Sequence, residues 1–141
     1  MDLNFIFDSQ LSCWKANTEF HGNKIEIRQF SPELRPSKTK SELAKETIEK
    51  VNCNWDKIET AIVASLLELH NEEWAEPEDG FPVLKKHEFL KRIIHQTIDL
   101  DIEDEYEDSI TMYFSDSGIF GNHSIQLFWH TDEDIDVSLV G

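Results

Sequence analysis

The sequence predicts an α+β domain in which two or three helices pack on one face of an antiparallel sheet. Apolar and polar residues alternate in the first and last thirds of the chain, as in strands with one buried face. In the middle third apolar residues recur every three or four positions, as on one side of a helix. A length of 141 residues corresponds to one domain, so we expect a single unit over residues 1–141 with the order β-β-β-α-α-β-β-β-β.

Three short strands are expected first, because apolar residues stand at alternate positions. These residues are Leu3, Phe5 and Phe7, then Trp14 and Ala16, then Ile25 and Ile27. Gly22-Asn23 lies between the second and third strands and supplies the positive-φ residues of a tight hairpin. Pro32 and Pro36 lack amide donors and end the pairing, so the stretch around them is a linker within the domain.

The middle third changes to helical spacing from about Ser37. The apolar face consists of Leu43, Thr47, Val51, Trp55, Ile58, Ile62, Leu66 and Leu69. Thr39 and Glu42 have the spacing of a capping box, which places the helix start there. Asn52-Cys53-Asn54 leaves open whether this is one long helix or two. Beyond the break at 76–82, a shorter helix is predicted over 86–96.

Four further alternating runs predict four strands in the last third. Their apolar positions are Ile98, Leu100 and Ile102; Ile110, Met112 and Phe114; Ile125, Leu127 and Trp129; and Ile135, Val137 and Leu139. Turn-rich segments connect the strands at 103–108, 116–118 and 132–134.

The charge is strongly acidic and unevenly distributed. With 13 basic and 29 acidic residues, the chain carries a net charge of −16, yet 39% hydrophobic residues suffice for a core. Binding to nucleic acid or to an anionic membrane is therefore not expected. Residues 93–141 contain twelve acidic residues and no lysine or arginine. The last four strands should thus form an anionic sheet.

Three interpretations of this acidic sheet remain open: a solvated surface, a docking surface for a basic protein, and a divalent-cation site. Aromatic residues among carboxylates favour docking, since such clusters resemble binding hot spots with a charged rim. The candidate docking residues are Asp99, Asp101, Glu103, Tyr113, Phe128, His130 and Asp136.

The alternative is a divalent-metal-binding or small-molecule-binding domain that uses the acidic loops Glu103–Asp108 and Asp132–Asp136. Alternate strand positions lie about 6–7 Å apart, which is too far for one ion unless a loop folds back. The sequence has no calcium-loop spacing, and we expect no resident metal or cofactor.

No catalytic motif is recognisable, so we expect binding rather than catalysis. Cys13 and Cys53 form no Cys-x-x-Cys pair and are expected to be reduced, mostly buried thiols. His87 and His95 are eight positions apart on the predicted short helix, whereas a helical zinc pair needs a spacing of four. With neither a signal peptide nor a membrane-spanning run, the expected location is the cytoplasm.

The stretch 113–129 contains the turn Phe120-Gly121-Asn122-His123 before a strand, and the chain ends in Val137-Ser138-Leu139-Val140-Gly141. Together with Trp14-Lys15-Ala16, these features resemble small bacterial domains of unknown function that are similar to immunity proteins encoded beside secreted polymorphic toxins. Many such toxins are basic nucleases. The resemblance implies an inhibitor that presents carboxylates where the phosphates of the substrate would lie, and it implies no catalytic residues.

Overall fold

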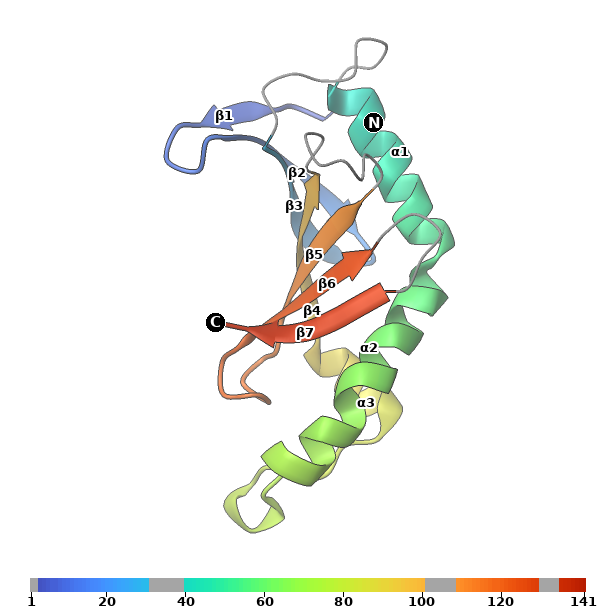
Figure 1. Ribbon diagram of the computed structural model, residues 1–141, viewed down its shortest axis with the longest axis vertical. Helices are drawn as coiled ribbons and strands as arrows, with labels where there is room; N and C mark the ends of the chain where they lie inside the picture. Colours follow the sequence, from blue (N-terminus) through green and yellow to red (C-terminus); the bar gives the residue numbers. More distant parts are fainter. Residues whose placement is uncertain (1–2, 31–39, 101–108, 130–134) are drawn as a thin grey trace.

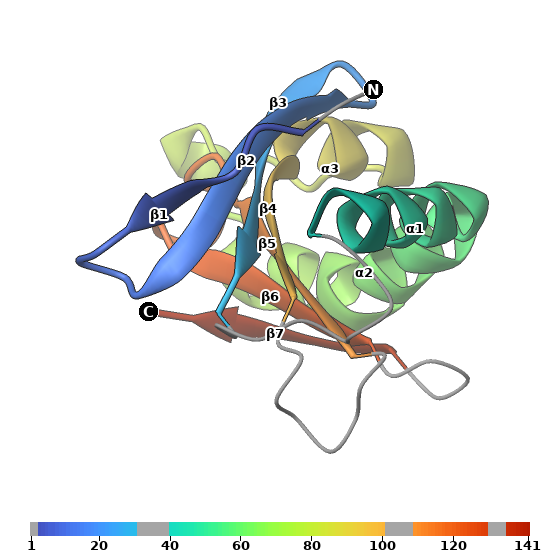
Figure 2. The ribbon, with the colours of Figure 1, turned by 90° about the horizontal axis from the view of Figure 1, so that it is seen from above.

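A computed structural model describes residues 3–30, 40–100, 109–129 and 135–141. It confirms the α+β class: one seven-stranded sheet is covered on one side by helices (Figure 1 and Figure 2). The elements are β1 (Ile6–Asp8), β2 (Cys13–Phe20), β3 (Asn23–Gln29), α1 (Lys40–Cys53), α2 (Trp55–Leu69), α3 (Lys86–Arg92), β4 (Ile94–Leu100), β5 (Ile110–Ser115), β6 (Ser124–Trp129) and β7 (Ile135–Val140). A π-helical turn, η1 (His70–Trp74), and a 3-10 turn, η2 (Pro77–Asp79), follow α2.

The strands lie in the sheet in the order in which they occur along the chain, from β1 to β7. Neighbouring strands are antiparallel except for β3 and β4, which are parallel and pair Ile27 with Ile98. A parallel pair needs a long crossover, and α1, α2 and α3 supply it. The expectation of an antiparallel sheet is therefore wrong for this one pair, because hydrophobic alternation carries no information about strand direction.

The hairpin between β2 and β3 turns one residue earlier than predicted. Phe20 pairs with Asn23, so the turn consists of His21 and Gly22, with φ angles of 49° and 79°. Both φ angles are positive, as in the type I′ turn of a two-residue hairpin.

The middle third forms two helices, which settles the question that the sequence left open. Asn54 separates them: its side-chain amide donates to the Lys50 carbonyl at 2.8 Å, and its own carbonyl accepts from Ile58 N at 3.0 Å. Thr39, the predicted cap, lies outside the described residues. The third helix ends at Arg92 instead of 96, because the residues from Ile94 onward pair with β5.

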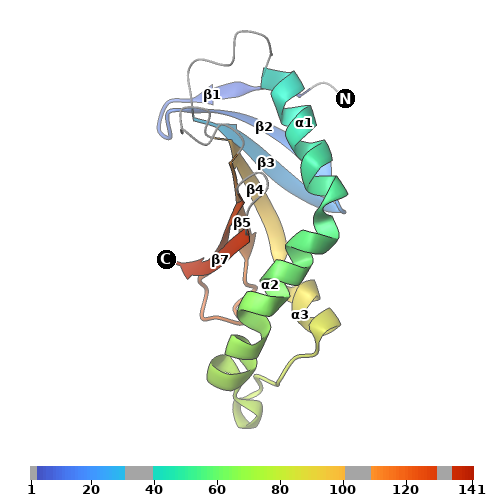
Figure 3. The same cartoon turned by 45° about the vertical axis from the view of Figure 1, so that its right-hand side comes forward.

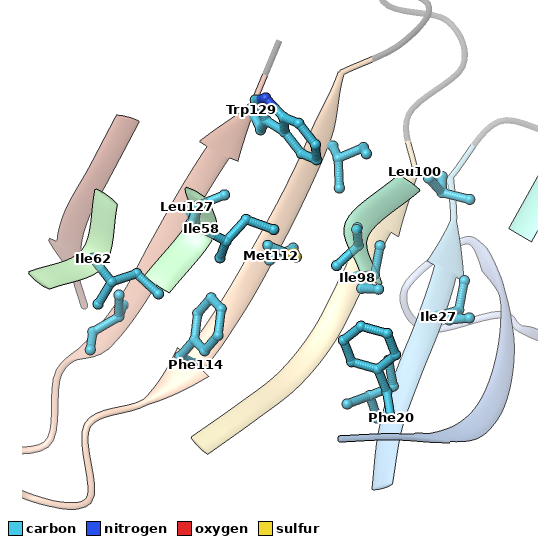
Figure 4. Packing of buried hydrophobic residues seen from close by; sticks show 14 of the residues in the cluster. Phe20, Ile27, Ile58, Ile62, Ile98, Leu100, Met112, Phe114, Leu127 and Trp129 are labelled. Carbon is cyan, nitrogen blue, oxygen red and sulfur yellow. The ribbon is translucent and has the colours of Figure 1, made fainter. Parts of the chain in front are cut away.

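The core lies between the helices and the inner side of the sheet (Figure 3 and Figure 4). Ile58 and Ile62 of α2 face Met112, Leu127 and Phe114, all of which are at most 2% exposed. This buried layer fixes which side of each strand faces the helices, so the alternate residues form a second, outer side. Within the described ranges, no helix is long and apolar enough to cross a membrane.

Candidate docking face

The outer side of the sheet presents one continuous row of side chains. In the register of the strands, each residue of this row lies opposite the next: Lys15, Arg28, Asp99, Thr111, Phe128 and Asp136. The neighbouring positions on the same strands, such as Ile98, Met112 and Leu127, point into the core. All the described helices lie on the core side (Figure 2), so no described helix covers this row. We call it the outer row.

Four of the seven predicted docking residues lie on this outer side. Asp99, Phe128 and Asp136 belong to the outer row, and Tyr113 is two positions from Thr111 on β5, opposite Gln126. The prediction that these four share one face is consistent with the strand register. Asp101, Glu103 and His130 lie outside the described residues.

Arg28 and Asp99 form the main polar contact of the face. Arg28 Nε donates to Asp99 Oδ1 at 2.6 Å, and Nη2 donates to Oδ2 at 2.7 Å. The two side chains are only 19% and 13% exposed. Burial raises the pKa of the Asp99 carboxyl, and the Arg28 guanidinium, which lowers it, offsets only part of this effect.

A small hollow lies beside this ion pair, with a volume of about 230 Å³. Its lining residues are Phe30, Asp99, Ser109, Thr111, Tyr113, Gln126 and Phe128. Gln126 Nε2 donates to Tyr113 Oη at 3.1 Å. The guanidinium carbon of Arg28 lies 5.6 Å from the ring centre of Phe30 and 5.8 Å from that of Tyr113, within the range of cation–π attraction. We call this feature the aromatic hollow.

The outer side carries both signs of charge, which the sequence did not suggest. Lys15 Nζ lies 2.8 Å from Asp8 Oδ2 and 3.6 Å from Glu26 Oε1, and Arg28 holds Asp99. Along the chain the basic residues are separated from the acidic strands. The fold brings them together because β3 pairs with β4. The outer side is therefore not uniformly anionic.

The described strand ends that flank the acidic stretches 101–108 and 130–134 lie at one end of the sheet. Leu100 pairs with Ile110, Ile110 with Trp129, and Trp129 with Ile135, so the ends of the described strands adjoin there. The two stretches contribute nine acidic residues to the sequence. They include most of the predicted metal loops, which thus lie outside the described residues. In the described part of the chain, no three His, Cys, Asp or Glu side chains gather closely enough to hold a metal ion.

The cysteines and histidines have separate positions. Cys13 is buried as expected, whereas Cys53, the last residue of α1, is exposed. His87 lies on α3 but His95 lies on β4, so the two do not share a helix.

His95 is buried among aromatic rings. Its ring stacks on Phe114 at 4.8 Å, and Nε2 donates to the Thr97 carbonyl at 3.1 Å. Burial lowers the pKa of His95 to about 4, with a smaller contribution in the same direction from His21. His95 is therefore neutral at physiological pH.

The stretch 113–129, which carried the resemblance, contains a tightly bonded loop. The buried Asp116 carboxylate accepts backbone N–H bonds from Gly118 at 2.9 Å, Phe120 at 3.1 Å and His123 at 3.0 Å. A Cβ atom at Gly121 would lie 3.2 Å from Trp74 Cζ3. These contacts give the loop a structural role.

Comparison with known proteins gives one match. Residues 3–138 match the model of a family described as "Uncharacterized protein conserved in bacteria (DUF2262)". No curated protein and no solved structure matches the chain.

Proposed function

Since the chain belongs to the bacterial family DUF2262, a family described only as uncharacterized, we propose a function from its own surface. The protein is a binding domain that docks a basic protein through the outer side of its sheet. Its role is that of an immunity-like or antitoxin-like inhibitor, and it acts in the cytoplasm.

The observation that carries this proposal is the outer row together with the aromatic hollow. Helices cover one side of the sheet, and the other side groups Tyr113, Phe128 and Phe30 around a concave site. Aromatic side chains that enclose a hollow contribute most to binding energy, because they displace water over a large area with few rotatable bonds.

Charge supports a basic partner. The chain carries −16 overall, and Asp136 is exposed at the β7 end of the outer row. Such an excess of negative charge steers a basic protein toward the surface and accelerates association. Lys15 and Arg28 are paired with Asp8 and Asp99, whereas Asp136 on β7 is an exposed carboxylate of the same side.

The first test is retention of proteins from the bacterial host on the immobilised domain, at low and at physiological salt. We expect one basic protein to be retained stoichiometrically, and more weakly at physiological salt, because exposed charges are then screened beyond about 8 Å. Retention of no basic protein at either salt would contradict the proposal.

Binding kinetics with that protein then test the face itself. Asp136→Lys should lower the association rate, because charge attraction accelerates the encounter of the two proteins. Phe128→Ala should raise the dissociation rate, because side-chain packing sets how long the complex lasts. The matched controls are Asp79→Lys and Phe81→Ala, which change exposed residues in the loop after α2. Equal effects of the variants and their controls would exclude the outer face.

A further inference from the structure

We propose that the aromatic hollow binds the guanidinium group of an arginine side chain from the basic partner. This inference rests on the proposed function and adds the chemical group that the face recognises. It follows from the contents of the hollow, from its size, and from how the chain holds its own arginine beside it.

Arg28 shows which groups at this place suit a guanidinium. Asp99 binds it through two parallel hydrogen bonds of 2.6 Å and 2.7 Å, and the rings of Phe30 and Tyr113 lie 5.6 Å and 5.8 Å away. Phe30, Tyr113 and Asp99 also line the hollow. A guanidinium is flat, weakly hydrated and suited to stacking on aromatic rings, whereas an ammonium group is compact and strongly hydrated.

The hollow retains acceptors for a second guanidinium. An ionised carboxylate offers about four lone-pair sites, and Arg28 uses two of those on Asp99. The hydroxyl group of Thr111 and the amide of Gln126 also line the hollow and supply oxygen acceptors. A carboxylate between two guanidinium groups compensates part of their mutual repulsion.

The size of the hollow fits one side chain. Its volume of about 230 Å³ lies below the roughly 300–1,000 Å³ of pockets that bind small molecules. Phe128, which lines the hollow on β6, lies opposite the exposed Asp136 on β7, so a carboxylate stands next to the site. An arginine at the tip of a partner loop would meet aromatic rings on entry and carboxylates around them.

The experiment uses N-acetylarginine methylamide as the probe, with the full chain observed by two-dimensional amide NMR. Saturable shifts are expected at Thr111, Tyr113, Gln126 and Phe128. The lysine analogue should bind about fivefold more weakly, and the norleucine analogue should not saturate, since cation–π attraction and hydrogen bonds both require the guanidinium. Phe128→Ala should weaken binding about fivefold. Phe81→Ala, a matched change at a 53% exposed phenylalanine elsewhere, should not.

Gln126→Leu is a second variant that keeps the volume and removes an acceptor, and it should also weaken binding. Equal binding of the norleucine analogue, shifts confined to other residues, or the absence of saturable shifts would overturn the inference. A basic protein that binds through the outer face in a Phe128-dependent way, without any arginine shift in the hollow, would overturn this inference and leave the proposed function standing. If neither the Phe128-dependent binding of a basic protein nor an arginine shift in the hollow were observed, both this inference and the proposed function would be overturned.

Discussion

At the scale of single residues, two buried polar side chains have structural roles that could not be inferred from their residue types. Asp116 satisfies three backbone N–H groups of one loop, and His95 lies in an aromatic layer with Phe114. Both lie near the ends of strands in the last third of the chain, residues 93–141, which contains no lysine or arginine. Acidic residues there therefore serve the fold as well as the surface.

Asp116→Ala should lower the free energy of unfolding by about 2–4 kcal/mol, because three N–H donors lose their acceptor and Phe120 N lies in the buried part of the loop. Urea denaturation measures the effect. Asp79→Ala, at an exposed carboxylate in a different loop, is the control and should have little effect. Equal stability of the Asp116 variant and the control would show that the loop holds its shape without this carboxylate.

His95 should make the protein sensitive to acid. Its pKa is about 4 in the fold and 6.5 ordinarily, so between these pH values the unfolded chain binds a proton that the folded chain excludes. The free energy of unfolding therefore falls as the pH decreases from 6.5 to 4, by about 3 kcal/mol in total.

The variant His95→Phe removes this loss, so relative to the wild type it should gain stability as the pH is lowered from 7 to 4. Denaturation at several pH values measures the difference. His87→Phe, the same change at an exposed site on α3, should keep the wild-type pH dependence. A parallel pH profile for wild type and His95→Phe would refute this account of His95.

At the scale of elements, the pairing of β3 with β4 joins two groups of strands, β1 to β3 and β4 to β7. Within each group, strands that are adjacent in the sheet are also consecutive in the chain. The Arg28–Asp99 ion pair crosses between β3 and β4 over a separation of 71 residues. It ties the N-terminal hairpin strands to the C-terminal strands on the outer side, opposite the helices.

We expect Arg28→Leu and Asp99→Leu each to destabilise the protein, and the double variant to cost less than their sum by about 2 kcal/mol. Removing one partner leaves the other charge largely buried and unpaired, whereas removing both does not. A double-mutant cycle of unfolding free energies gives the coupling. The corresponding cycle at Lys15 and Asp8, a more exposed pair, should give a clearly smaller coupling. Additive effects at Arg28 and Asp99 would contradict this role.

Most of the elements and the hairpin of β2 and β3, but not the parallel pairing of β3 with β4, could be predicted from the sequence. Alternation identified the strands because one side of each faces a core, as at Met112 and Leu127. The helix predicted over 86–96 includes Ile93 and Ile94, because they stand four positions after Phe89 and Leu90 and so continue a helical spacing. The backbone nevertheless becomes extended at Ile93, with φ −92° and ψ 111°, and pairs with β5 from Ile94. The parallel pair depends on tertiary packing, which a local pattern does not contain.

The candidate site was predictable in part for the same reason. Alternate positions of a strand face the same side of the sheet, and this alternation places four of the predicted residues on the outer side: Tyr113, Phe128, Asp99 and Asp136. Arg28 and Phe30 were missed because they belong to β3 and the residue after it, far away in sequence. One signal in the sequence could have identified Arg28. It is a basic residue at a polar position of a predicted strand, where it can form an ion pair with an acidic residue on a neighbouring strand.

At the scale of the whole molecule, the net charge of −16 opposes the compact state through self-repulsion. Raising the sodium chloride concentration should therefore raise the melting temperature by a few degrees, as the repulsion is screened. Thermal melts followed by circular dichroism measure this. Chloride is the appropriate salt, since sulfate also strengthens hydrophobic burial. An unchanged or lower melting temperature would show that the ion pairs outweigh the repulsion.

The order of the strands has a mechanical consequence. Because the sheet follows the chain from β1 to β7, the first and last strands are its two edges. Tension on either terminus loads one edge strand at a time, and hydrogen bonds that break in succession resist less than bonds sheared together. A cellular unfoldase pulling from the C-terminus would peel off β7 with Asp136 first, and then β6 with Phe128. The β6 and β7 part of the proposed docking surface would thus be lost before the other strands unfold, so that degradation would weaken the hold on a bound partner early.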